Sequence, residues 1–143
     1  MLKSLMMGAV VLSTLAIAAC DSSQSKTTTY SASLDGKSEV PSVTTNATGQ
    51  AKLTLDRASK TLSWEITYKD LSGNATAAHL HGPAKAGANA GVVVPVGTTL
   101  ASPIRGSAVV SDAVIGQLDA GDLYVNIHTA ANPNGEIRGQ VKK

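Results

Sequence analysis

Apolar and polar residues alternate in two short runs near the end of the chain. Residues 123–127 alternate Leu, Val and Ile with Tyr and Asn, and residues 137–141 alternate Ile, Gly and Val with Arg and Gln. A period of two is the pattern of a half-buried strand. The segment 132–135, Asn-Pro-Asn-Gly, lies between the runs and has strong turn chemistry. Residues 121–141 are therefore expected to form a β-hairpin.

The register of this hairpin decides which side chains share a face. With Ile127 opposite Ile137, Leu123 meets Val141 on the apolar face. A slip of one residue would bury the polar residues and expose the apolar ones, so this register is favoured. The other, outward face then collects three cross-strand pairs of polar residues: Tyr124 with Gln140, Asn126 with Arg138, and His128 with Glu136.

The chain before the hairpin carries the same kind of alternation. Further strands are expected over residues 30–34, 39–41, 49–55, 62–68, 75–82, 92–96 and 104–110. One short helical turn is expected over residues 112–118, with Asp112 as its N-cap and Val114, Ile115 and Leu118 facing inward. Turns at intervals of roughly 8–12 residues predict an all-β domain, a Greek-key β-sandwich or barrel of about seven or eight strands.

The core of this domain is expected to consist of Val, Leu, Ile and Ala, because the chain contains no Phe. Trp64 is the only Trp, and the pattern pairs it with Leu53 across a second hairpin. It is interpreted as core filler. A domain of roughly 110 residues can bury enough apolar surface to be stable with an ordinary margin.

The N-terminal segment has a different composition. Lys3 precedes the apolar stretch 5–19, which is too short for a comfortable membrane span. Residues 1–19 are therefore predicted to be a signal peptide. Ile-Ala-Ala-Cys at 17–20 resembles a bacterial lipobox, and that resemblance implies cleavage before Cys20 and a diacylglycerol on its sulfur. An ordinary signal peptide with an incidental Cys is the alternative.

Lipidation would make the chain a membrane-tethered protein of the bacterial cell envelope, facing the periplasm or the exterior. Two or three acyl chains form a stable anchor, since each buried methylene contributes about 0.8 kcal/mol. Residues 20–29 are rich in Ser, Thr and Lys and are expected to form a flexible tether. Asp21 resembles the inner-membrane retention signal of enteric bacteria, but the choice between inner and outer membrane stays open.

The remaining composition limits the metal ligands, disulfides and partners that the mature domain can have. Cys20 is the only Cys, and Met1, Met6 and Met7 are the only Met residues, so the mature domain has no sulfur ligand and no disulfide. The net charge is +2, and the chain has only three Tyr and one Trp as aromatic residues. Without a basic stripe, no nucleic-acid partner is expected.

Three histidines are the candidate metal ligands. His79 and His81 are two residues apart on an expected strand, so both point away from the core that Leu80 enters. His128 lies on the outward face of the hairpin. If the two strands are neighbours, the three imidazoles meet and suit one copper or zinc ion, as Cu(II) or Zn(II). Three surface histidines with ordinary hydrogen bonds are the alternative.

Other polar residues of the hairpin are expected to complete this site. Glu136 is the available carboxylate, either as a ligand or as an acceptor for a ring N–H. Asn126 and Arg138 are expected to support the ligands, and a purely structural polar network is the alternative. An anionic ligand is a further alternative, because the guanidinium of Arg138 can hold a carboxylate in a bidentate fork.

Four segments resemble the CHRD domain, which is repeated in the vertebrate developmental antagonist chordin and occurs singly in many bacterial exported proteins. They are LDGKSEVP at 34–41, AHLHGPA at 78–84, AGDLYVNIHT at 120–129 and NPNGEIRGQV at 132–141. The match runs from about residue 30 to 141, so residues 30–143 are expected to be a CHRD-like domain. The resemblance implies an immunoglobulin-like or Cu/Zn superoxide dismutase-like barrel.

The resemblance implies little about activity, because the cysteine-rich modules of chordin are the ones associated with growth-factor binding. The chain has too few histidines for the metal sites of superoxide dismutase and lacks its disulfide, so dismutase activity is not expected. No catalytic motif is found, and an enzyme is not expected. The expected function is metal binding at the membrane. The alternative is a non-catalytic module that binds an envelope protein or a polysaccharide through the hairpin face and the loop 83–91.

Overall fold

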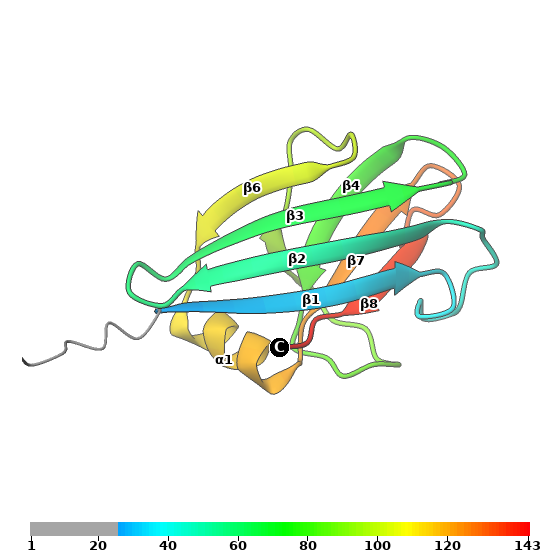
Figure 1. Ribbon diagram of the computed structural model, residues 1–143. Helices are drawn as coiled ribbons and strands as arrows, with labels where there is room; N and C mark the ends of the chain where they lie inside the picture. The colour runs from blue at the N-terminus through cyan, green and yellow to red at the C-terminus, as the bar shows by residue number, and fades with distance from the viewer. Residues whose placement is uncertain (1–25) are drawn as a thin grey trace, which may run out of the picture.

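The computed structural model describes residues 26–143 (Figure 1). Within them the chain forms eight strands and one helix, in the order β1 (Thr27–Asp35), β2 (Thr48–Asp56), β3 (Thr61–Lys69), β4 (Ala75–His81), β5 (Val92–Pro95), β6 (Ile104–Val109), α1 (Asp112–Ala120), β7 (Tyr124–Thr129) and β8 (Ile137–Gln140). The predicted all-β fold of about seven or eight strands is confirmed.

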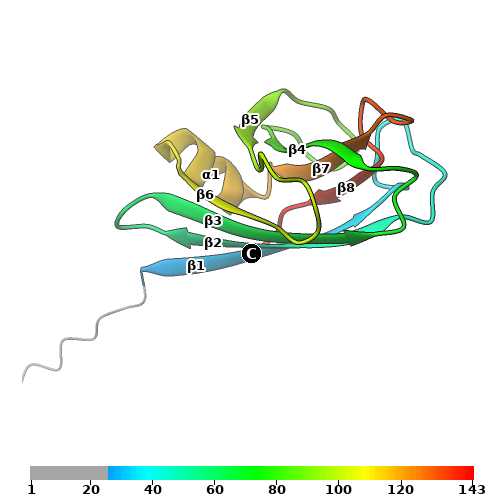
Figure 2. The ribbon, with the colours of Figure 1, turned by 90° about the horizontal axis from the view of Figure 1, so that it is seen from above.

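All strand pairs are antiparallel, and the sheet has the order β5-β4-β7-β8-β1-β2-β3-β6. Figure 2 shows how the sheet curls, so that β1, β2, β3 and β6 lie in one layer and β4, β5, β7 and β8 in the other. The two layers join where Asp35 of β1 pairs with Arg138 of β8. The result is a nearly closed barrel around one apolar core.

The core follows from the alternation along the long strands. Leu53 of β2 pairs with Trp64 of β3, as the sequence predicts, and both are buried. Trp64 donates its indole N–H to the carbonyl oxygen of Val96 at 2.6 Å, which satisfies its one polar group. Its predicted role as core filler is therefore confirmed.

The helix α1 is longer than the predicted turn, and its N-cap lies one residue earlier. Ser111, not Asp112, is its N-cap, because the Ser111 hydroxyl accepts from the backbone N–H of Val114 at 3.3 Å. The helix ends at Gly121, whose φ of 70° is the left-handed conformation that favours glycine. Leu118 is buried against the barrel, as predicted.

Two boundaries differ from the sequence prediction. β1 begins at Thr27, so it includes the last residues of the expected tether. Residues 39–41 are not a strand; they belong to a loop in which Gly36 accepts from the N–H groups of Glu39 and Val43. Residues 1–19, Cys20 and Asp21 lie outside the described residues. Within residues 26–143, no helix has the length and apolarity needed to cross a membrane.

The closing hairpin has the predicted register. Ile127 pairs with Ile137 and Asn126 with Arg138, and Val141 donates to the carbonyl oxygen of Leu123 at 2.9 Å. A Cβ at residue 139 would overlap the backbone of β1, so glycine is required there for β8 to approach β1.

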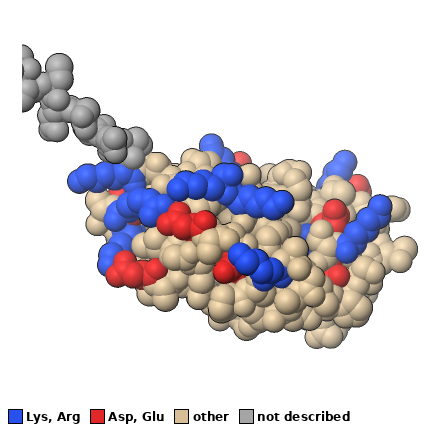
Figure 3. Space-filling model, turned by 90° about the horizontal axis from the view of Figure 1, so that it is seen from below, with Lys and Arg blue, Asp and Glu red and all other residues tan. Residues whose placement is uncertain are grey.

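Charged side chains of both signs are interspersed on the face shown in Figure 3. Several form ion pairs at the surface, among them Arg57 with Asp119 at 2.7 Å and Arg105 with Glu65 at 2.7 Å. Exposed pairs of this kind contribute about 0–1 kcal/mol each to stability. The fold therefore depends on its core and on the buried polar groups described below.

Candidate metal centre

The pairing of β4 with β7 brings the three histidines together. His79 lies opposite Asn126, and His128 lies opposite Ala77 in the same ladder. One ring nitrogen from each of His79, His81 and His128 lies within 4.8 Å of the other two, so the three can hold one metal ion. The two strands are thus neighbours, which is the condition on which the sequence-based metal prediction depended. His128 is buried, whereas His79 and His81 are half-buried.

The turn after β7 orients the ring of His128. Its Nδ1 lies 2.9 Å from the carbonyl oxygen of Pro133. A carbonyl can only accept, so Nδ1 carries the hydrogen and Nε2 carries the lone pair. This is how most metal-binding histidines are held, with the second ring nitrogen bonded to a carbonyl or carboxylate.

His81 is held in the same way by a different segment. Its Nδ1 lies 3.0 Å from the carbonyl oxygen of Ala90, in the loop between β4 and β5. Its Nε2 is buried and has no hydrogen-bond partner among the described residues. Leaving a buried polar atom unpaired is costly, and such an atom needs an explanation. A ligand nitrogen awaiting a metal ion provides one.

His79 completes the cluster through its Nδ1, which lies 3.2 Å from Nε2 of His128. Because Nε2 of His128 carries a lone pair, Nδ1 of His79 is the donor in the metal-free protein. Two nitrogens bound to one zinc ion at 2.0–2.1 Å in tetrahedral geometry lie about 3.3 Å apart. The His79–His128 pair therefore already has the separation of two ligands.

The electrostatics favour the neutral form of His79 and His81. Burial, together with the neighbouring His128 and His81, lowers the pKa of His79 below its ordinary value of 6.5. Burial also lowers the pKa of His81 and outweighs the hydrogen bond to Ala90, which raises it, while His128 and Arg138 add smaller lowering contributions. Neutral imidazole is the form that binds metal ions, so the site favours the ligand form at neutral pH.

Glu136 does not join the histidines, contrary to the sequence prediction. Its carboxylate is fully buried and accepts from the N–H and hydroxyl of Ser72, and from the hydroxyls of Thr129 and Thr45, at 2.6–2.9 Å. Burial alone would raise the pKa of Glu136, but these hydrogen bonds outweigh it and lower the pKa to about 2. Glu136 is a structural carboxylate that joins three loop and strand ends.

The sequence pattern placed the polar face of the hairpin on the outside of the domain. In the structure this face is covered and most of its side chains are buried. Asn126 and Arg138 are 2% and 1% exposed. Arg138 donates to the carbonyl oxygen of Ala88 at 2.7 Å and to Oδ1 of Asn89 at 3.0 Å, both in the loop that covers it. A period of two tells which way a side chain points, but it does not tell which distant segment covers that side.

Asn126 supports a second buried carboxylate rather than a histidine. Its Nδ2 donates to Oε1 of Glu39 at 2.6 Å. Burial raises the pKa of Glu39 to about 7, although the positive charge of Arg138 and the hydrogen bonds to the carboxylate oppose the shift. Sequence reasoning missed Glu39, because it lies in a loop far from the hairpin and carries no periodic signal.

Sequence reasoning also missed Tyr124 as part of the site. Its ring lies parallel to that of His81, with 5° between the planes and 4.9 Å between the centroids. On the other face of the Tyr124 ring, Cζ of Arg138 lies 3.4 Å from the centroid. The signal was present in the register, because Tyr124 shares a face with Asn126 and His128.

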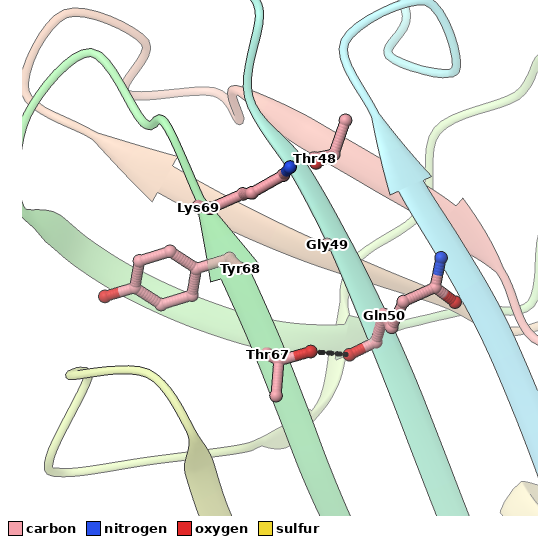
Figure 4. Close-up of a pocket in the computed structure, with 6 residues that line it drawn as sticks. All are labelled: Thr48, Gly49, Gln50, Thr67, Tyr68 and Lys69. Carbon is pink, nitrogen blue, oxygen red and sulfur yellow. Dashed lines mark hydrogen bonds between the residues drawn. The ribbon is translucent and has the colours of Figure 1, made fainter.

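A hollow of ≈ 330 Å³ lies elsewhere on the barrel, on β2 and β3 (Figure 4). It is lined by Thr48, Gly49, Gln50, Thr67, Tyr68 and Lys69. None of these residues is a metal ligand of the histidine cluster, and the hollow is open on one side. The hollow is therefore separate from the histidine cluster on β4 and β7.

The comparison with family models matches the CHRD domain over residues 30–141. The search of curated proteins and the search of solved structures find no match. The matched region contains every strand except the first residues of β1, and it includes all three histidines and the loops that orient them. The chain belongs to the CHRD domain family.

Proposed function

We propose that this CHRD domain binds one Cu(II) or Zn(II) ion through Nδ1 of His79 and Nε2 of His81 and His128. The observation that carries the proposal is that one ring nitrogen from each of the three histidines lies within 4.8 Å of the other two. Carbonyl oxygens of Pro133 and Ala90 hold two of the rings in the tautomer that a ligand needs.

The donor set favours these two ions. Imidazole nitrogens suit copper and zinc, and residues 21–143 contain no Cys or Met that could add sulfur. The nearby carboxylates are engaged, Glu136 with hydroxyls and Glu39 with Asn126. Water would therefore fill the remaining position. Without a free carboxylate as general base, the proposal is binding and not catalysis.

The proposal includes a lipid anchor at Cys20, which would hold the domain in the bacterial cell envelope. The geometry of β1 supports a metal site that is directed away from such an anchor. Asp35 lies at the opposite end of β1 from Thr27 and pairs with Arg138 of β8. His79 of β4 is two strands away from Arg138, because β8 pairs with β7 and β7 pairs with β4. At about 3.3 Å per residue, the eight steps of β1 span roughly 26 Å.

Metal titration tests the binding proposal. The full-length chain, purified in a mild detergent, is titrated with Cu(II) and with Zn(II) beside a His79→Ala/His81→Ala variant. A Gln50→Ala/Thr67→Ala variant on the hollow of Figure 4 is the control for mutation of the barrel surface. The parent chain and the control are expected to bind one ion, and the histidine variant is not. Equal binding by all three would overturn the proposal.

Cell fractionation tests the anchor separately. The parent chain is expected in the membrane fraction, and a Cys20→Ser variant is expected to leave it. A parent chain that is recovered without lipid on Cys20 by mass spectrometry would contradict this part of the proposal while leaving metal binding untouched.

A further inference from the structure

The surroundings of His81 suggest more than a ligand on a strand. Two contacts enclose its ring: Ala90 bonds its Nδ1 and Tyr124 stacks on its face. Its Nε2 is buried and has no hydrogen-bond partner within residues 26–143. Ala90 and Tyr124 also contact each other. The Tyr124 hydroxyl accepts from the N–H of Ala90 at 3.1 Å and lies 3.2 Å from its carbonyl oxygen.

Arg138 holds both of these contacts in place. Its guanidinium packs on the face of Tyr124 opposite His81. Its N–H groups bond Ala88, Asn89 and, at 3.5 Å, the carbonyl oxygen of Lys85, which belong to the same loop as Ala90. A planar guanidinium can stack and donate in several directions at once, which a lysine ammonium cannot do.

The burial of the charged Arg138 side chain has a cost in stability that a purely structural role does not require. Arg138 is 1% exposed, and none of the ion pairs formed within residues 26–143 involves it. The charge of Arg138 acts on Glu39 without forming an ion pair with it, and a buried cation costs stability unless carbonyl oxygens and a π face replace its hydration. The loop carbonyls and the Tyr124 ring do so here, and they are the same groups that enclose His81.

We infer that Arg138 and Tyr124 are positioning residues for the metal ligand His81, an inference that rests on the proposed metal binding. Arg138 fixes the loop 83–91 and the Tyr124 ring, and these two fix the tautomer and orientation of His81. Nε2 of His81 therefore faces the other two histidines before any ion arrives. The ring of His128 does not depend on Arg138 and Tyr124, because its Nδ1 bonds the carbonyl oxygen of Pro133 in the turn after β7.

Nitrogen-15 NMR of the imidazoles and zinc titration together test the inference on the full-length chain. Tyr124→Phe keeps the stacked ring and removes only the hydroxyl that bonds Ala90. The matched control is Tyr68→Phe, which removes a hydroxyl that donates to a loop carbonyl, Leu100, at 2.6 Å on another part of the barrel. Arg138→Lys is the second variant, with Arg105→Lys at the surface as its control.

In the metal-free parent, His81 and His128 are expected in the tautomer with hydrogen on Nδ1. Tyr124→Phe and Arg138→Lys are expected to reduce that population for His81 and to leave His128 unchanged. Zinc affinity should fall about 10–100-fold in both, as for other residues that orient a ligand. The control variants should bind zinc as the parent does.

The two readouts separate this inference from the proposed function. A parent chain that binds neither Cu(II) nor Zn(II) contradicts the proposed function, whereas the tautomer of His81 in the metal-free variants still decides the positioning role. An unchanged His81 tautomer in Tyr124→Phe overturns the inference, and so does zinc affinity within twofold of the parent. If Arg138→Lys does not fold, Tyr124→Phe alone decides.

Discussion

Two buried polar clusters lie along the same hairpin, and they differ in how completely their hydrogen bonds are satisfied. At the turn end, Glu136 receives four hydrogen bonds from Thr45, Ser72 and Thr129. In the neighbouring cluster, His81 keeps a buried nitrogen without a partner, and His79 and His128 share one hydrogen bond between two ligand atoms.

This difference separates a structural role from a binding role. A cluster whose acceptors are all matched stabilises the fold and has no capacity left for a ligand. A cluster with aligned, unmatched lone pairs costs stability unless something binds there. Glu136 therefore has a structural role, and the three histidines remain the proposed metal ligands. Mutations in the Glu136 cluster should lower stability and leave metal affinity unchanged. Mutations of the histidines should lower metal affinity and leave the stability of the metal-free protein nearly unchanged.

The largest expected effect is the loss of stability on removing Glu136. Glu136→Ala leaves four donors without their acceptor, one of them buried and three partly buried, and each unpaired buried group costs about 1–3 kcal/mol. The free energy of unfolding should fall by about 4 kcal/mol or more, because the donors are only partly able to find water. Urea denaturation measures the loss. Glu65→Ala, which removes an exposed ion pair, should cost under about 1 kcal/mol.

Acid should weaken the same cluster. The pKa of Glu136 is about 2 in the folded protein against an ordinary 4.5. Because the folded pKa is the lower one, the ionised carboxylate stabilises the fold above about pH 4.5, and this contribution is lost as the pH falls toward 2. The loss should approach about 3 kcal/mol. Denaturation at pH 7, 4.5 and 2.5 measures it, and Glu136→Gln should show a flatter profile over this range.

Metal should stabilise the parent through the other cluster. A ligand present at a hundred times its dissociation constant adds about 2.7 kcal/mol to the free energy of unfolding. Thermal unfolding with Zn(II) and then with a chelator in excess should show a melting temperature that rises and returns. His81→Ala should show no such shift while unfolding close to the metal-free parent. A zinc shift that persists in His81→Ala would place the ion elsewhere.

The smallest expected effect comes from a single bond at the edge of the Glu136 cluster. Thr45→Ala removes one of the four donors, and a hydrogen bond to a charged group contributes about 1.5–3 kcal/mol when fully buried. Water reaches this partly buried position, so the expected loss is about 1 kcal/mol. Zinc affinity should not change. A change in zinc affinity would show that the two clusters are coupled.

Much of the fold was predictable from periodicity alone. The strand alternation predicted the pairing of Ile127 with Ile137 and of Leu53 with Trp64, because slipping either register would expose apolar side chains. The face that carries His79, His81 and His128 was predicted for the same reason. Short-range patterns contain this information, since it depends only on which side of a strand each residue occupies.

The rest depends on contacts between distant segments. Nothing local in the sequence indicates that β4 pairs with β7, or that the loops 36–47 and 83–91 cover the hairpin face. The predicted ligand Glu136 was wrong for this reason, because its partner Ser72 lies 64 positions away in the chain. Glu39 and Tyr124 were missed because their roles appear only once these segments have folded together.

The most direct measurement of the central claim is X-ray absorption at the zinc edge of the full-length chain, loaded with one equivalent of Zn(II). Three imidazole nitrogens at about 2.0–2.1 Å, with an oxygen from water completing the shell, are the expected result. His81→Ala should lose one imidazole from that shell. A parent spectrum with oxygen ligands only, or one that His81→Ala leaves unchanged, would contradict the assignment of His79, His81 and His128 as a metal centre.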